Sequence, residues 1–262
     1  MQPFVDIHCH LIPGIDDGAA DWDATLAMAR IAVDDGIGAM ICTPHQLGGF
    51  AHNLGDEIRR RTQQLQTQLR RHNIPLIVLP GGDVRIEPDM IKHLRSGQVL
   101  TLADRRRHVL LELPHELYFP IDDLLAQLER QQMQGILSHP ERNQGLLQDR
   151  ELVARLVERG CLMQVTAGSL HGTFGPESEK MSVWMLERGL VHFVATDAHG
   201  PKSRRPLMRR AYDAVCKIAD EATAQRICCE FPAAVAAGRA VRPPAPTKPS
   251  RSFSWLPWRR AS

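Results

Sequence analysis

The sequence predicts one α/β domain built from parallel β/α units, followed by a short tail without regular structure. Three observations lead to this prediction. The length of 262 residues suits a single α/β domain. A content of 43% hydrophobic and 24% charged residues is ordinary for a globular protein, and it excludes a mainly disordered, coiled-coil or collagen-like chain. Short apolar runs alternate with amphipathic stretches, as in chains where strands and helices alternate.

Seven apolar runs predict strands, and six amphipathic stretches predict helices. The first helix, over residues 21–35, places Leu26, Ala29 and Val33 among acidic residues, and Gly36 ends it. The second helix is long and polar, and the last is rich in basic residues. The predicted strands cover residues 4–7, 39–42, 76–79, 109–111, 135–137, 161–165 and 191–195; the predicted helices cover residues 21–35, 54–72, 121–134, 148–159, 177–188 and 203–220.

A barrel and a doubly wound sheet both satisfy this alternation. No internal repeat of fixed period stands out. No GxGxxG or GxxxxGKS/T motif follows any of the runs, so a nucleotide-binding sheet has no support.

The last part of the chain differs from the rest in composition. Residues 243–257 include five prolines, which exclude a helix or a central strand. We therefore expect a domain over residues 1–240 and a disordered, basic tail over 241–262. Residues 239–262 hold six basic residues and no acid, which leaves 26 basic and 30 acidic residues, a net charge of −4, in the first 238. A nucleic-acid-binding surface is not expected on such a body.

No run of about 18 uncharged apolar residues occurs, and the N-terminus lacks the pattern of a signal peptide. These features predict a cytoplasmic protein. The six cysteines are scattered without a CxxC pair, so we expect them to be reduced and mostly buried.

Polar residues that can bind metals follow the predicted strands. The first run leads into His8 and His10, whose spacing of two puts both imidazoles on one face of a strand. Such a pair can chelate one metal ion, or it can be a pair of structural histidines. Asp16 and Asp17 follow in a loop, where the alternative role is to cap the helix that begins near Asp21.

Six of the seven run ends carry His, Asp or Glu. Because the carboxyl ends of parallel strands meet at one edge, we expect a shared site there. The mixture of imidazole and carboxylate without thiolate favours Mn, Fe or Zn, and the number of ligands favours more than one ion. The residues in question are His8, His10, His45, Asp83, Glu112, His139, Glu141, Asp197 and His199.

The motifs resemble those of the polymerase and histidinol phosphatase (PHP) superfamily: HxH after the first strand, TPH after the second, then SHPER and DAH. The segment DIHCHLIPGIDDG with CTPH is more specific and resembles the CpsB/CapC-type bacterial protein-tyrosine phosphatases, over roughly residues 4–215. This resemblance implies a distorted (β/α)7 TIM-like barrel of the PHP type that holds three divalent ions, with Mn²⁺ expected and Fe or Zn as alternatives.

The resemblance also implies a set of site residues. One ion is expected on His8, His10, Asp197 and Asp83; a second on Asp83, Glu112 and His139; and a third on Asp17, His45 and His199. It further implies that Arg142, of HPER, and Arg204, after DAH, bind phosphate, although Arg205 is the arginine that precedes the proline. His139 is expected to assist catalysis as well as to bind metal.

Two positions depart from the family pattern. Asp83 stands where glutamate is usual after PGx, and Glu87 is the alternative donor four residues later. Gln46 follows TPH where a second histidine is usual, so any role of that histidine is absent here.

The chemistry that these residues support is hydrolysis of phosphate esters. Divalent ions polarise phosphoryl oxygens, and arginine contacts them through a planar pair of donors. A thiol nucleophile is not expected, because no cysteine is followed six residues later by arginine. The GxSxG motif of a serine nucleophile does not occur either.

Three functions follow from this chemistry. The first is a metal-dependent protein-tyrosine phosphatase whose substrate is a membrane-associated tyrosine autokinase that controls capsule or exopolysaccharide synthesis. The second is a small-molecule phosphatase, for example one acting on histidinol phosphate. The third is a catalytically weak regulatory module. In the tail, Trp255 and Trp258 beside Arg259 and Arg260 suit an anionic membrane or an acidic partner, or the tail is a solvated extension without a role.

Overall fold

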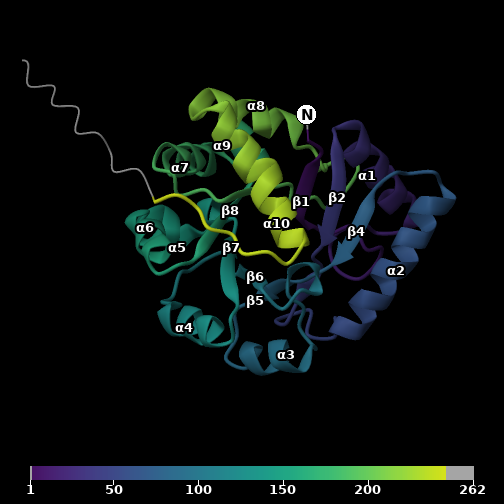
Figure 1. The fold of residues 1–262 in the computed structure, drawn as a ribbon, viewed down its shortest axis with the longest axis horizontal. Coiled ribbons are helices and arrows are strands. Elements are labelled where there is room, and N and C mark those ends of the chain that lie inside the picture. The colour runs from purple at the N-terminus through teal and green to yellow at the C-terminus, as the bar shows by residue number, and fades with distance from the viewer. Residues whose placement is uncertain (1, 246–262) are drawn as a thin grey trace, which may run out of the picture.

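In a computed structural model of the chain, nine strands among the described residues form a closed barrel surrounded by helices (Figure 1). The structure describes residues 2–245. All seven predicted strands are present, and two short strands, β3 and β5, were not predicted. The strands are β1 (Phe4–Cys9), β2 (Ile37–Cys42), β3 (His45–Gln46), β4 (Ile77–Pro80), β5 (Asp83–Arg85), β6 (His108–Glu112), β7 (Gln134–Ser138), β8 (Leu162–Thr166) and β9 (Phe193–Ala195).

The helices α1 to α8 lie around the outside of the strands (Figure 1). The first begins where the Asp21 carboxylate accepts a hydrogen bond from the amide of Ala24 at 2.8 Å, so Asp21 itself caps it. The helices are α1 (Trp22–Asp34), α2 (Gly55–Arg71), α3 (Met90–Ser96), α4 (Asp122–Arg130), α5 (Gln144–Gln148), α6 (Glu151–Glu158), α7 (Pro176–Glu187), α8 (Arg209–Ile218), α9 (Glu221–Gln225) and α10 (Phe231–Ala236), with a π-helical turn (Arg226–Glu230) joining α9 to α10.

One helix begins later than predicted. The sequence predicted a helix over residues 203–220, but α8 starts at Arg209. Pro206 disfavours helical backbone in the residue before it. The Asp35 carboxylate then accepts the amide hydrogens of Met208 and Arg209, at 2.5 and 2.8 Å, and this fixes the start of the helix. Residues 203–208 are therefore a loop, and this loop carries Arg204.

The strands form one closed barrel, although they divide formally into two sheets. One sheet has the order β1-β2-β4 and the other β3-β5-β6-β7-β8-β9, and all pairs are parallel. Only two residues separate β2 from β3, and only two separate β4 from β5. The chain from β2 to β3 therefore runs parallel to the chain from β4 to β5, and the pairs β2–β4 and β3–β5 are successive parts of one pairing. When β2–β3 and β4–β5 are each counted as one interrupted strand, the barrel has seven strands, which confirms the expected (β/α)7 barrel.

The last seam of the barrel joins β1 to β9 through hydrogen bonds. The amide of Asp197 donates to the carbonyl of His8 at 2.8 Å, and the amide of His10 donates to the carbonyl of Ala198 at 2.9 Å. The buried Asp6 carboxylate strengthens the seam, because it accepts hydrogen bonds from the amide of Thr196 at 3.0 Å and from the Thr196 hydroxyl. Asp6 thus holds the two strands that deliver His8 and Asp197.

Side chains along the strands alternate between the barrel interior and the helical layer. On β6, Leu110 points into the interior while Val109 and Leu111 belong to the outer layer. Helix α10 closes the interior at the amino ends of the strands, where it lies across the ring of strands (Figure 1). The interior cluster comprises Ile7, Ile41, Leu102, Ala103, Leu110, Ile136, Leu162, Phe193, Ala195, Val235 and Val241.

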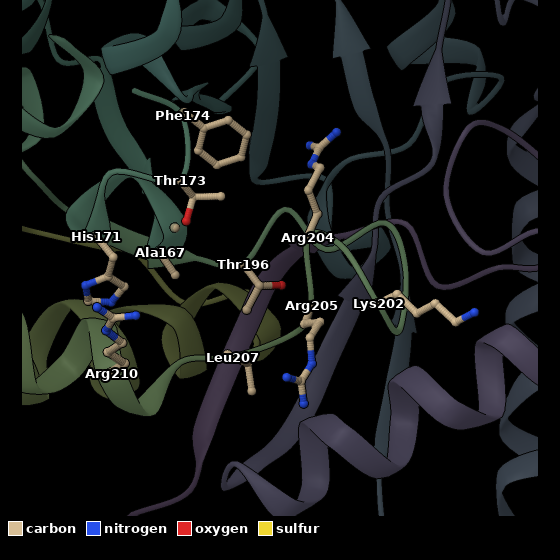
Figure 2. A pocket seen from close by; sticks show the side chains of 11 residues that line it. Ala167, His171, Thr173, Phe174, Thr196, Lys202, Arg204, Arg205, Leu207 and Arg210 are labelled. Carbon is tan, nitrogen blue, oxygen red and sulfur yellow. The ribbon is translucent and has the colours of Figure 1, made fainter. Parts of the chain in front are cut away.

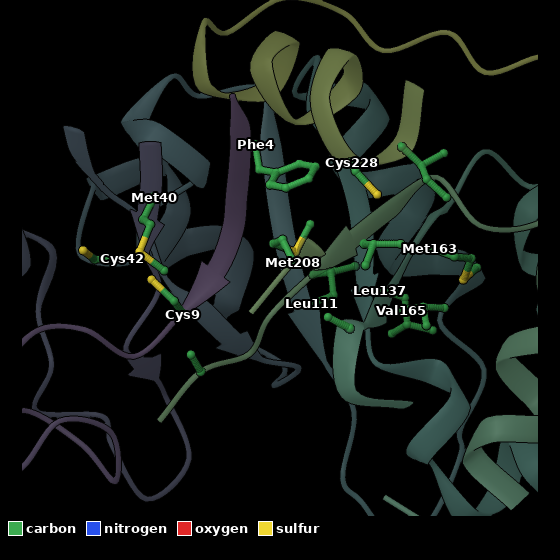
Figure 3. Packing of buried hydrophobic residues seen from close by; sticks show 14 of the residues in the cluster. Phe4, Cys9, Met40, Cys42, Leu111, Leu137, Met163, Val165, Met208 and Cys228 are labelled. Atoms are coloured by element: carbon green, nitrogen blue, oxygen red, sulfur yellow. The ribbon is translucent and has the colours of Figure 1, made fainter. Parts of the chain in front are cut away.

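The outer apolar layer binds the helices to the strands. In Figure 3, Leu111, Leu137, Met163 and Val165, from three neighbouring strands, lie together in this layer. Full burial of an aliphatic side chain contributes roughly 1.5–3 kcal/mol. With one end of the barrel closed by α10, the carboxyl ends of the strands remain as the face on which a site can form.

The predicted tail lies mostly outside the described residues, since residues 246–262 are not described. Val241, at the start of the predicted tail, is buried against the interior cluster. Among residues 2–245, no helix has the length and apolar character needed to cross a bilayer.

Folding buries one histidine, His108, without a hydrogen-bond partner for either ring nitrogen among the described residues. Burial, and then the charge of Arg107, lower the pKa of His108 to about 4. In the unfolded chain the pKa returns to about 6.5. The unfolded state therefore binds more protons between these values, and stability is lost as the pH falls from about 6.5 towards 4.

We predict that His108→Phe weakens this pH dependence. Between pH 7.5 and 5, the wild type should lose about 2 kcal/mol more free energy of unfolding than the variant. Urea denaturation of the metal-free proteins at both pH values measures this difference. His72→Phe, at an exposed histidine, is the matched control and should behave as the wild type. Equal losses in wild type and His108→Phe would contradict the prediction.

Candidate active site

Two imidazoles from the carboxyl end of β1 and one carboxylate from the residues after β9 lie close together. His8 and His10 are fully buried, and their Nε2 atoms face each other at 3.3 Å. Asp197 follows β9, and its Oδ1 atom lies 3.3 Å from His8 Nε2 and 3.5 Å from His10 Nε2. Such a set of two imidazoles and one carboxylate can hold a divalent ion.

Hydrogen bonds on the outer side orient both imidazoles. His8 Nδ1 lies 2.8 Å from Gln164 Oε1, and His10 Nδ1 lies 2.7 Å from Asp16 Oδ2. If each Nδ1 donates its hydrogen, each Nε2 lone pair is free to face the site, as in metal-binding histidines generally. Sequence analysis missed the part played by Gln164. The available signal was a glutamine within a strand that is otherwise almost entirely apolar.

Asp83 lies at the centre of the cluster and is completely buried. Among the described residues, neither of its carboxylate oxygens has a hydrogen-bond donor. Its Oδ2 atom lies 3.6 Å from His8 Nε2 and 3.3 Å from His45 Nδ1. Burial raises the pKa of Asp83, but His8 and His45 outweigh it and hold the pKa below its usual value. A charged carboxylate without donors is the arrangement that a bound cation satisfies, so the residues fit a metal site.

A second set of side chains lies nearer the solvent. Asp17 Oδ1 is 3.5 Å from His45 Nε2 and 3.4 Å from His199 Nε2, and His10 completes this group. Burial lowers the pKa of His45, but the neighbouring Asp17 and Asp83 carboxylates raise it overall to about 11. Asp17 therefore faces the site and does not cap α1.

Glu112 and His139 belong to different groups of possible ligands, and both groups contain Asp83. Glu112 groups with Asp83 and His45, whereas His139 groups with Asp83 and His8. Asp83 is the carboxylate that these two groups share, as expected for the acid that the resemblance places on two ions. Burial and the charge of Asp83 raise the pKa of Glu112 to about 7. Burial and the charge of Arg142 lower the pKa of His139 to about 3.

Two arginines extend the site towards the solvent. Arg142 Nη1 and Arg204 Nη2 each lie 2.5 Å from Asp197 Oδ2. The guanidinium carbons of Arg142 and Arg204 lie 4.1 and 5.8 Å from the centre of the Phe174 ring. Arg205 leaves the same loop in the opposite direction from Arg204 (Figure 2), which is why only Arg204 reaches Asp197.

The backbone at these positions is unusual. His139, Asp197 and Arg204 have φ angles of 35°, 49° and 48°, in the left-handed region that non-glycine residues rarely occupy. Buried Glu141 anchors the turn after His139, since it accepts hydrogen bonds from the Thr166 amide at 3.0 Å and the Ser169 hydroxyl at 2.7 Å. Strain at several residues of one site is typical of functional sites.

A cavity of about 210 Å³ opens over the cluster. Its wall includes Arg142, Arg204 and two residues not predicted for the site, Arg85 and His115. Arg85 Nη1 lies 3.6 Å from Glu112 Oε2. The lining of the cavity therefore combines side chains that can bind metal with cationic side chains.

Comparison with known proteins identifies the family. A family profile described as "Capsular polysaccharide synthesis, CpsB/CapC" matches residues 4–237. The chain belongs to the CpsB/CapC family.

Relatives within the CpsB/CapC family are named as phosphatases. The chain is 39% identical to tyrosine-protein phosphatase YwqE of Bacillus subtilis over 202 residues, 76% of this chain and 79% of that protein. It is 26% identical to tyrosine-protein phosphatase CpsB of Streptococcus pneumoniae over 218 residues, 81% of this chain and 90% of that protein.

Solved structures agree with this assignment. A structure described among those of YwqE from Bacillus subtilis and CpsB from Streptococcus pneumoniae, "unique metal-dependent tyrosine phosphatases", has a TM-score of 0.87 and 34% identity and covers 93% of this chain and 99% of that one. The lactonase Lmo2620 of Listeria monocytogenes, with a TM-score of 0.59 and 12% identity over 88% of this chain and 94% of that one, shares the fold alone.

Two departures from the CpsB/CapC pattern have structural explanations. Glu87, the alternative donor to Asp83, accepts a hydrogen bond from the Gly48 amide at 3.0 Å and belongs to none of the ligand groups. Gln46 is buried and structural: its amide nitrogen donates to the Asn53 carbonyl at 2.7 Å, and its oxygen accepts from the Leu100 amide at 2.8 Å. A Cβ at Gly82 would lie 2.2 Å from the Gln46 oxygen, so glycine is needed before Asp83.

The cysteines of this CpsB/CapC chain lie in packing positions. All six are free, and five are buried. Burial raises the pKa of Cys161 to about 12, while burial and the charge of Glu230 raise that of Cys229 to about 11. A reactive thiol needs a lowered pKa, so these two cysteines lack the character of a nucleophile.

We predict that Asp83→Ala removes metal from the protein, whereas Asp83→Glu retains it. A carboxylate shared between ligand groups serves more than one ion, and glutamate keeps that function with one more methylene. Elemental analysis of the purified variants measures the effect, with Glu87→Ala as the matched control that should keep the wild-type content. Wild-type metal content in Asp83→Ala would show that Asp83 is not a shared ligand.

Proposed function

We propose that this chain is a metal-dependent protein-tyrosine phosphatase. The observation on which the proposal rests is the buried Asp83 carboxylate, which lacks a donor and is shared by two ligand groups beside a cavity whose lining includes arginines. Membership of the CpsB/CapC family and the names of the relatives support the substrate class.

The proposed metal site holds three divalent ions. His8, His10, Asp197 and Asp83 serve the first, Asp83, Glu112 and His139 the second, and Asp17, His45 and His199 the third, with Mn²⁺ as the proposed metal and Fe or Zn as alternatives. When bound, such ions polarise a phosphoryl group and promote attack by water. The outer hydrogen bonds of Gln164 and Asp16 would hold the His8 and His10 rings in the geometry that binding requires.

Arg142 and Arg204 are proposed to bind the phosphoryl oxygens. A guanidinium presents parallel N–H donors that match two oxygens of a phosphate, and Phe174 holds both planar groups near the site. The leaving group of phosphotyrosine is a phenolate with a pKa near 10, so it departs with little need for a proton. We propose that His139, besides binding metal, assists this step.

The physiological substrate that we propose is phosphotyrosine on a membrane-associated tyrosine autokinase that controls capsule or exopolysaccharide synthesis. The family description, which names capsular polysaccharide synthesis, supports this choice. A small-molecule substrate such as histidinol phosphate is the competing possibility that the first experiment below separates.

We expect the purified protein to hydrolyse phosphotyrosyl peptides only with divalent metal. EDTA should abolish phosphate release and manganese should restore it, because the ligands are imidazoles and carboxylates. Alkylation of accessible cysteines should leave most of the activity. Phosphate release from histidinol phosphate is measured in parallel. Full activity of metal-free protein, or faster hydrolysis of histidinol phosphate than of every peptide, would reject the proposal.

Arg142→Lys should lower kcat/KM for phosphotyrosyl peptides by roughly ten-fold or more, because lysine keeps the charge but loses the planar pair of donors. Metal content and thermal unfolding should remain those of the wild type. Arg155→Lys, at an exposed ion pair with Asp149, provides the control for a surface arginine. An unchanged kcat/KM in Arg142→Lys would place Arg142 outside the phosphate site.

A further inference from the structure

A second cavity of about 190 Å³ lies beside the candidate active site and shares Arg204 with it. Its floor comes from the ends of β8 and β9, through Ala167 and Thr196. Figure 2 shows His171 and Arg210 on one side of this cavity, Phe174 and Thr173 on another, and Arg204 beyond Thr196. The two cavities therefore meet at the arginine that we place on the phosphate.

The lining of this second cavity is positively charged. It includes Lys202, Arg204, Arg205 and Arg210 and no acidic residue. Arg205, Arg210 and Lys202 form no ion pair with any residue in the described range 2–245, whereas most other arginines near the site are paired. Unpaired cations gathered on a concave surface attract an anionic group.

Two buried polar atoms in this cavity also lack partners. His171 Nε2 and Arg204 Nε are shielded from solvent and make no hydrogen bond to the part of the chain that is described. Arg210 lies beside the His171 ring (Figure 2), and burial together with the charge of Arg210 lowers the pKa of His171, while Glu179 acts in the opposite direction. Buried polar atoms in native proteins usually have partners, so two unpartnered nitrogens in residues that line one cavity support a polar group bound there.

The geometry points to a second anion-binding subsite, formed by His171, Arg204 and Arg210, that takes an acidic side chain of the substrate close to the phosphotyrosine. This inference rests on the proposed phosphatase function. Neighbouring residues of an extended peptide are about 3.3 Å apart along the chain, so a side chain one to three residues from the phosphotyrosine can reach an adjoining cavity. The apolar floor suits the methylene groups of glutamate, and the cations suit its carboxylate.

The test compares matched phosphotyrosyl peptides with the manganese-loaded full chain. One peptide carries glutamate within three residues of the phosphotyrosine, and its partner carries glutamine at the same positions. The readout is the ratio of the two kcat/KM values, in which changes common to both substrates cancel. We expect the wild type to favour the glutamate peptide about five-fold, and the preference to fall with added salt.

Variants assign the preference to this cavity. Arg210→Gln should bring the ratio of the two kcat/KM values close to one. Arg210→Glu should instead favour a peptide with lysine at the same positions over the glutamate peptide, a gain that a misfolded protein cannot show. Lys217→Gln removes an exposed charge from the same helix outside the cavity and should keep the wild-type ratio. A third peptide, with phosphoserine in place of glutamate, distinguishes a second phosphate from a carboxylate as the preferred anion.

The outcomes separate the subsite from the phosphatase function. Equal kcat/KM values for the glutamate and glutamine peptides in the wild type would overturn the subsite and leave the function intact. A preference that persists unchanged in both Arg210 variants would also overturn it. Failure of the manganese-loaded protein to hydrolyse either peptide would overturn the function and the subsite with it.

Discussion

A carboxylate buried without hydrogen-bond donors is the constraint on which this site depends. Transfer of an ion such as the Asp83 carboxylate from water to the protein interior costs several kcal/mol unless positive charge compensates it. Without metal, compensation has to come from protons on neighbouring imidazoles, and the raised pKa of His45 shows this effect. Bound divalent ions would supply the same charge without protons, so metal binding and proton binding compete at the same residues.

Such a concentration of charge is tolerable only on a rigid support. The barrel brings strand ends together, and a set of buried polar anchors fastens the loops between them. Asp6 holds β1 to β9, Glu141 holds the turn after β7, and Gln46 holds the loop after β3. Each anchor forms at least one hydrogen bond with a backbone group, and this support allows left-handed backbone to persist at neighbouring His139 and Asp197.

Folding also redistributes charge. The first 238 residues carry more acidic than basic side chains, yet arginines gather around the opening of the barrel. The guanidinium groups of Arg142 and Arg204 both lie near the Phe174 ring, and Arg210 lines the adjoining cavity together with Arg204. A protein with a mildly acidic body thus presents a cationic entrance, and a low-dielectric cleft concentrates such a field on anionic substrates.

The sequence by itself determined the order and type of the long elements, because apolar periodicity over many residues reports which face is buried. It also indicated the candidate site, since parallel strands place their final residues at one edge and a spacing of two puts His8 and His10 on one face. The tertiary structure decided other features, among them the short strands β3 and β5, the late start of α8 at Arg209, and the membership of Asp83 in the ligand groups of both Glu112 and His139. These features depend on partners far away in the chain, such as Gln164 for His8 and Asp35 for the start of α8. Closure of the barrel brings such partners into contact, and no local pattern in the sequence records it.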